Sequence, residues 1–136
     1  MKNLQSSRIG SLYATITLLG VIVILLSCSS LERLLVGTWE RSSGNKSVVL
    51  TLHSDETLVA QLENEVLGGL LVDRGNVSGT WRVNDGRLIV NVTESTTGMV
   101  TVGHTWSDEI VEVSETQLIL RTQSGDVEEY TRAESG

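Results

Sequence analysis

Three side chains are the usual starting points for catalytic or metal chemistry: His53, His104 and Cys28, which is the only cysteine. Neither histidine belongs to a recognisable metal-binding spacing, and one cysteine cannot build the usual zinc sets. His104 shares its strand parity with Trp106, which predicts an inward position, whereas His53 is predicted to face outward. One imidazole without partners does little chemistry. The sequence therefore predicts no catalytic residue, no metal site and no cofactor.

Adjacent acidic residues occur at 55–56, 108–109 and 128–129. Neighbours on a strand point to opposite faces, so none of these pairs can act as two catalytic carboxylates from one strand. We expect them on a solvated rim. The sequence also has no G-x-S-x-G nucleophile motif and no glycine-rich phosphate loop. We do not expect an enzyme, because one would require His104 within hydrogen-bond reach of a buried carboxylate.

An apolar segment, Leu12 to Leu26, follows the basic residues Lys2 and Arg8 and leads to Cys28. It is long enough to cross a bilayer, which takes about 20 residues as a helix. A basic start, an apolar stretch and then small residues is the order of parts in a secretory signal. The lone cysteine cannot form an intramolecular disulfide and needs another explanation. An ordinary cleaved signal with an incidental cysteine and an uncleaved anchor helix are the alternatives.

The end of this segment resembles a bacterial lipoprotein signal, because Leu25 and Ser27 match the positions three and one before the modified cysteine. The resemblance implies that residues 1–27 are removed as a signal peptide and that the Cys28 thiol carries a diacylglyceryl group with fatty acyl chains such as palmitate. Ser29, in place of an aspartate, resembles the signal for the outer membrane. We therefore expect a lipid-anchored protein of the cell envelope, in the outer membrane and facing the periplasm.

The rest of the chain, about 109 residues, has the size of one domain. It holds 17 acidic and 8 basic residues, a formal charge of −9. This charge argues against binding to nucleic acid, whose phosphates need a basic face. The absence of proline and phenylalanine and the many Val, Thr, Ile and Leu residues favour β-strands.

A short linker and helical turn over 28–34 is expected to lead into one β domain over 35–133. Alternation with period two predicts strands at 36–42, 47–53, 57–63, 77–83, 88–92, 99–106, 110–113, 117–121 and 127–132. Gly68-Gly69 marks the tip of a long hairpin, and Asn84-Asp85-Gly86 a tight turn. About eight antiparallel strands with short turns favour closure into an up-and-down barrel, which removes both sheet edges. Such a barrel is either filled by side chains or holds one small ligand.

The stretch Gly37-Thr38-Trp39, directly after the helical turn, resembles the first strand of lipocalin-like barrels. A second copy, Gly79-Thr80-Trp81, is similar to the middle strand of small bacterial lipocalin-like lipoproteins. The resemblance implies that Trp39 closes one end of the barrel and that an arginine from near the end of the chain covers it. Arg132 matches this arginine by position, and Arg121 is a weaker candidate.

Two functions follow from this fold. The first is binding of a small apolar ligand at the open end of the barrel, with candidate lining residues Leu67, Leu70, Leu71, Trp81, Met99, His104 and Trp106. The second is an acidic protein-binding module with a filled barrel, an inhibitor or assembly factor of a basic envelope protein. The apolar tip over 66–72 is predicted to be a lid or contact patch, or to pack back onto the barrel.

Overall fold

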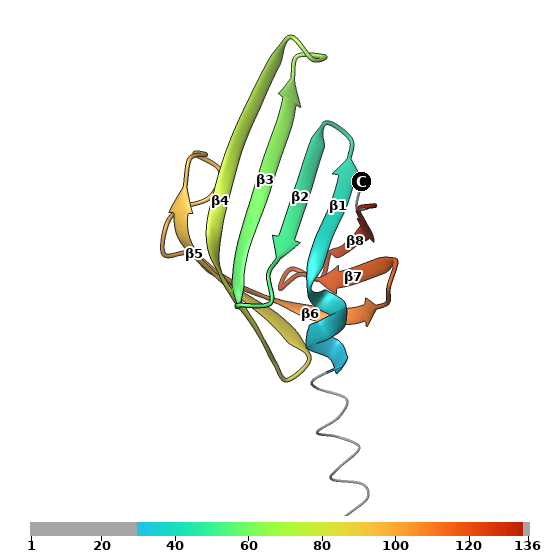
Figure 1. The fold of residues 1–136 in the computed structure, drawn as a ribbon. Coiled ribbons are helices and arrows are strands. Elements are labelled where there is room, and N and C mark those ends of the chain that lie inside the picture. The colour runs from blue at the N-terminus through green and yellow to red at the C-terminus, as the bar shows by residue number, and fades with distance from the viewer. Residues whose placement is uncertain (1–29, 135–136) are drawn as a thin grey trace, which may run out of the picture. The chain divides into compact units, whose positions relative to one another are not determined.

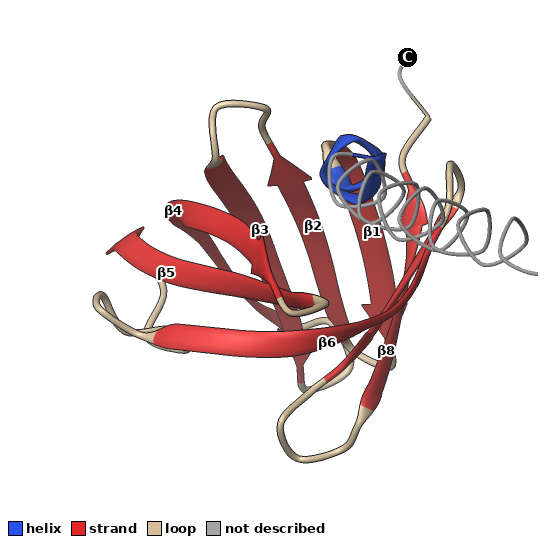
Figure 2. Cartoon of the chain, turned by 90° about the horizontal axis from the view of Figure 1, so that it is seen from below, coloured by secondary structure: helices blue, strands red, loops and turns tan. Residues whose placement is uncertain are grey.

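Eight antiparallel strands close into a barrel in the computed structural model, which describes residues 30–134. Each strand pairs with its sequence neighbour, and β1 also pairs with β8 (Figure 1). Figure 2 shows β1 to β3 on one side of the ring and β6 with β8 on the other. The strands are β1 (Gly37–Ser43), β2 (Lys46–Leu52), β3 (Thr57–Val66), β4 (Leu71–Asn84), β5 (Arg87–Ser95), β6 (Thr105–Val113), β7 (Gln117–Arg121) and β8 (Val127–Arg132). The predicted all-β barrel is confirmed.

The core gathers at one end of the barrel, which we call the closed end. A helical turn over residues 30–35 precedes β1 there. The most deeply buried large side chains include Trp39, Leu35, Leu52, Leu58 and Leu118. Because β1 starts at this end and the strands alternate in direction, the β2–β3, β4–β5 and β6–β7 turns also lie there. The other turns lie at the opposite, open end.

The β3–β4 hairpin extends beyond the rest of the barrel (Figure 1). The pairing of β2 with β3 ends at Lys46 and Asn64, whereas β3 and β4 stay paired as far as Val66 and Leu71. The connecting residues 67–70 form a turn in which Leu67, Gly68 and Gly69 all have positive φ. The predicted hairpin tip is therefore correct, and it is a free-standing two-stranded ribbon.

One part of the predicted strand pattern is wrong. Residues 99–104 form part of a loop, and 105–113 form a single strand in place of the two predicted at 99–106 and 110–113. Gly103 has a φ of 85° and donates its N–H to the carbonyl of Val92, which turns the chain before β6 begins. The polar residues 107–109 continue the strand by pairing with residues 87–89 of β5, and Asp108 lines the barrel interior.

The predictions for residues 1–27 and for Cys28 lie outside the described residues. Between residues 30 and 134, no helix has the length and apolarity that crossing a bilayer requires.

Candidate functional site: the barrel cavity

Trp39 fills the closed end. It is completely buried, and its Nε1 donates a hydrogen bond of 2.8 Å to the carbonyl of Leu35 in the helical turn. The guanidinium of Arg132 lies over the indole, with Cζ 4.2 Å from the ring centroid. A Cβ on Gly37 would come within 2.2 Å of Arg132 Nη1. The glycine of the G-x-W stretch therefore makes room for the arginine that covers the tryptophan.

Arg132 also ties three chain segments together. Its guanidinium donates to the carbonyls of Leu34, Val36 and Glu115, which lie in the helical turn, directly before β1 and in the β6–β7 turn. Arg121, the weaker candidate, instead pairs on the outside with Glu109 at 3.0 Å. Of the two arginines, the structure places Arg132 against Trp39.

Trp81, from the second G-T-W stretch, belongs to the same closed end. It is 5% exposed, and its Nε1 donates a hydrogen bond of 2.9 Å to the carbonyl of His53 in the β2–β3 turn. A Cβ on Gly79 would meet the carbonyl oxygen of Asn91 at 2.0 Å, so this glycine lets β4 and β5 approach closely. Trp81 is therefore part of the hydrophobic core and does not line the cavity.

A cavity of about 510 Å³ occupies the interior above this core. This volume lies within the range of small-molecule sites, roughly 300 to 1,000 Å³. Most of its wall is apolar, since the inward positions of the strands carry aliphatic side chains. The apolar lining residues are Val48, Leu50, Ala60, Leu62, Val77, Leu88, Val90, Val100, Trp106 and Leu120.

Three polar side chains from β1 and β8 form a bonded group on the cavity wall. Arg41 Nη2 lies 3.2 Å from Glu128 Oε1, and the Tyr130 hydroxyl donates 3.1 Å to Glu128 Oε2. The Arg41 guanidinium also lies over the Tyr130 ring, 5.5 Å from its centroid. Burial, and then the neighbouring Glu128 carboxylate, raise the pKa of the Tyr130 hydroxyl. The hydroxyl therefore stays protonated and acts as a donor, and both oxygens of Glu128 are engaged.

Asp108 on β6 differs from this group because it has no partner. It is 9% exposed and lines the cavity, yet no described residue makes a hydrogen bond or an ion pair with its carboxylate. Burial raises the pKa of the Asp108 carboxyl, the Glu128 carboxylate adds to this, and Arg87 acts in the opposite direction. A buried charge without a partner costs free energy. This carboxylate is therefore an unused acceptor on the wall of the cavity.

His104 and Trp106 also line the cavity, on the β5–β6 loop and the start of β6. Their rings are 5.7 Å apart and tilted by 44°. The hydrogen bonds of residues 30–134 include none between His104 and a carboxylate. In the same range, no three His, Cys, Asp or Glu residues lie close enough to hold a metal ion.

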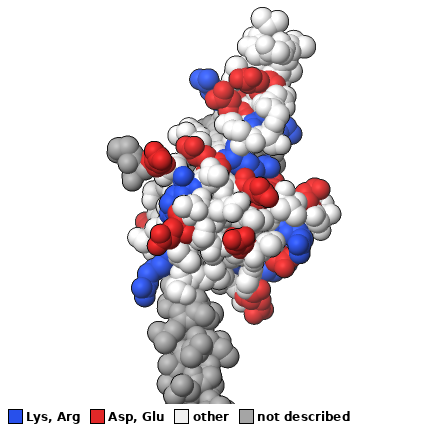
Figure 3. Space-filling view, turned by 90° about the vertical axis from the view of Figure 1, so that its right-hand side faces the viewer, with Lys and Arg blue, Asp and Glu red and all other residues white. Residues whose placement is uncertain are grey.

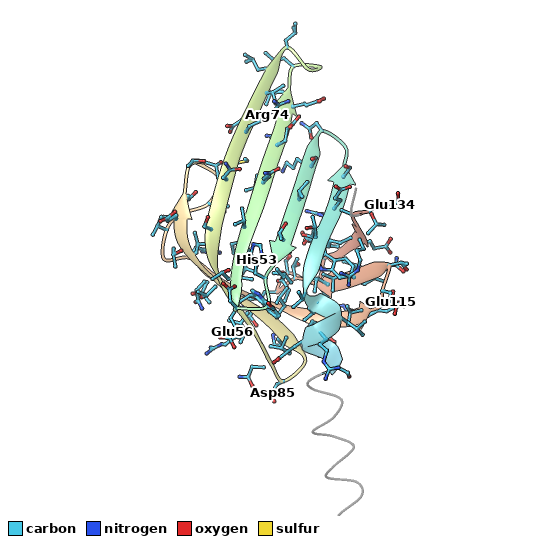
Figure 4. All side chains as sticks on the ribbon, viewed as in Figure 1. His53, Glu56, Arg74, Asp85, Glu115 and Glu134 are labelled. Carbon is cyan, nitrogen blue, oxygen red and sulfur yellow. The ribbon has the colours of Figure 1, made fainter. Side chains whose placement is uncertain are left out.

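Four other predicted lining residues lie away from the cavity. Leu67, Leu70 and Leu71 are 69%, 83% and 59% exposed at the tip of the β3–β4 hairpin, so this tip does not pack back onto the barrel. Met99 is 45% exposed in the β5–β6 loop. Their predicted place in the cavity lining is wrong. β3 and β4 are longer than their neighbours, so the three leucines lie beyond the mouth of the barrel. Figure 4 shows His53 at the far end, and its side chain is exposed as predicted.

Four charged or aromatic cavity residues on the strands, Arg41, Asp108, Glu128 and Tyr130, were not predicted as lining residues, and neither were residues 122–124 of the β7–β8 turn. The expectation that 108–109 and 128–129 lie on a solvated rim is wrong for Asp108 and Glu128, which face inward. Strand parity could have found all four, since each lies two residues from an inward tryptophan, arginine or another member of the group.

No protein-family model matches the sequence, and no curated protein is similar to it. The solved structures do contain similar folds. The crystal structure of a lipocalin-like protein from Bacteroides uniformis matches this chain with a TM-score of 0.52 and 11% sequence identity. The match covers 74% of this chain and 99% of that chain. This chain has a lipocalin-like fold. At such low identity the likeness shows the fold alone, so the function of the lipocalin-like barrel is argued from its cavity.

Proposed function

We propose that this protein is a lipid-anchored lipoprotein of the cell envelope whose barrel binds one small, largely apolar ligand. The cavity of about 510 Å³ carries this proposal. Its wall is mainly aliphatic, and its few polar groups converge from β1, β6 and β8. An apolar wall with a few placed polar groups is the usual make-up of a ligand site.

The anchor rests on the sequence of the leader. Cys28 follows an apolar segment with the residues of a lipoprotein signal before it. Each buried CH₂ of an acyl chain contributes about 0.8 kcal/mol, and one chain holds only marginally, so two or three chains make a durable attachment. We place the protein in the outer membrane, facing the periplasm, as a binding protein and not an enzyme.

The alternative, an acidic protein-binding module with a filled barrel, has less support. A cavity of about 510 Å³ is inconsistent with a barrel interior filled by side chains. A docking face for a basic protein should also gather acidic residues in one place. On the face drawn in Figure 3, acidic and basic side chains are interspersed.

Native mass spectrometry of the protein extracted from its own membrane tests the proposal. The expected mass includes a lipid on Cys28, absent from Cys28→Ala, and a second, non-covalent mass from the ligand. A matched variant, Ala60→Phe, places a bulky apolar side chain in the cavity from β3 and replaces no polar group. It should keep the lipid mass and lose the ligand mass. An unmodified Cys28 would refute the lipid anchor. A ligand mass that persists in Ala60→Phe would show that the ligand does not bind in the cavity.

A further inference from the structure

The charges that face the cavity do not cancel. Arg41 and Glu128 neutralise each other at 3.2 Å, and Tyr130 is held as a neutral donor to Glu128. The Arg41 Nε atom is buried and has no acceptor, but it has no exposed surface to offer a ligand. Asp108 is left as the one carboxylate on this wall without a partner among the described residues.

The position of Asp108 shows what would satisfy it. Its side chain is about nine-tenths buried and lines the same cavity as the aliphatic residues of β2, β3, β5 and β7. Water or protein normally pairs a buried carboxylate, because the unpaired charge is costly. Arg87, the cation that acts on the Asp108 carboxyl, donates instead to Ser107 from its Nε and Nη2 at 2.8 and 2.7 Å. The described residues therefore give Asp108 no hydrogen-bonded cation, and a ligand in the cavity can supply one.

We infer that the ligand of this cavity carries a protonated amine on a mainly apolar body, with the Asp108 carboxylate accepting the hydrogen bonds of the ammonium group. The inference rests on the proposed function and names its ligand class. The ammonium group supplies both the missing positive charge and up to three donors. Its apolar body lies against the aliphatic wall, where burial of apolar surface drives binding.

Other head groups fit this wall less well. A carboxylate would add a further negative charge beside Asp108, and the Arg41 guanidinium already pairs with Glu128 at 3.2 Å. A hydroxyl could donate one hydrogen bond to Asp108 but would leave the charge uncompensated. The expected order of affinity is therefore amine, then alcohol, then carboxylate.

Tryptophan quenching by three ligands that share one body tests this order. The probes are 8-bromooctylamine, 8-bromooctan-1-ol and 8-bromooctanoate, added to the full chain in phosphatidylcholine nanodiscs. Bromine quenches a nearby indole, and Trp106 is the one tryptophan that lines the cavity. Trp106→Phe therefore reports the background from Trp39 and Trp81 at the closed end. Asp108→Asn removes the charge, and Asp85→Asn is the matched control, since Asp85 is exposed in the β4–β5 turn (Figure 4).

The amine should bind at least about tenfold more tightly than the alcohol, as expected for hydrogen bonds to a charged group. Asp108→Asn should abolish this preference while leaving alcohol binding within about threefold, and Asp85→Asn should change neither. If the alcohol or carboxylate binds as well as the amine, or if Asp108→Asn leaves the order unchanged, the ligand class is overturned and the proposed function stands. If no probe gives Trp106-dependent quenching, the proposed function fails as well. The order of affinity for the three probes is measured in the wild-type protein, so this test does not depend on whether a variant folds.

Discussion

Replacement of Arg132 by alanine should destabilise the barrel more than the same replacement of an exposed arginine. The change removes the guanidinium that lies 4.2 Å from the Trp39 ring centroid, a contact that contributes about 1 kcal/mol. It also removes the donors to three backbone carbonyls, each hydrogen bond contributing about 0.5–1.5 kcal/mol net. Because Arg132 is only half-buried, water can replace part of this loss. We expect the free energy of unfolding to fall by about 3 kcal/mol.

Urea denaturation followed by tryptophan fluorescence measures this loss, since Trp39 is completely buried in the fold. Arg121→Ala is the matched control. Its ion pair with Glu109 joins side chains that are 46% and 47% exposed, so its loss should cost at most about 1 kcal/mol. Arg132→Lys keeps the charge but cannot donate to three carbonyls in a fixed fork, so it should fall between wild type and alanine. Equal losses in Arg132→Ala and Arg121→Ala would refute the reasoning.

Three further predictions concern single side chains. Asp108→Asn should raise the free energy of unfolding at pH 7 by about 1 kcal/mol. Its carboxyl has a raised pKa in the fold, so the folded state binds the proton more tightly, and the gain should vanish below about pH 3, where both states are protonated. Gly79→Ala should cost more than about 2 kcal/mol, because the new Cβ meets the Asn91 carbonyl, whereas Gly98→Ala enters open space; equal urea midpoints would contradict this. Ala60→Phe should lower the affinity for 8-bromooctylamine at least about tenfold, and unchanged calorimetric titrations would place the ligand elsewhere.

The barrel could be predicted because most of its strands have one buried and one solvated face. In β2, for example, Leu50 and Leu52 are buried while the residues between and beside them are not. Period two is then visible in the sequence, and short turns such as Asn84-Asp85-Gly86 fix which strands are neighbours. Asp85 and Gly86 have φ values of 49° and 69°, as a tight hairpin turn requires.

The cavity was harder to predict because its polar residues break the alternation that reveals a strand. Asp108 follows Trp106 at the correct parity, but a carboxylate is expected to face solvent, so the pattern predicts a strand that ends at Trp106. The same expectation hid Glu128 beside Tyr130. The lengths of β3 and β4 relative to their neighbours could not be predicted either, because no feature of the local sequence shows that β2 and β5 stop pairing sooner. That difference in length is why Leu70 lies in solvent and not over the mouth.

The position of a bound ligand tests the central claim most directly. Crystals of the protein grown with 8-bromooctylamine locate the bromine by its anomalous scattering. We expect a bromine peak inside the ring of strands, among Leu50, Val90 and Leu120, with the ammonium group at hydrogen-bond distance from Asp108. Bromine only outside the barrel, for example against the exposed leucines of the β3–β4 tip, would contradict it.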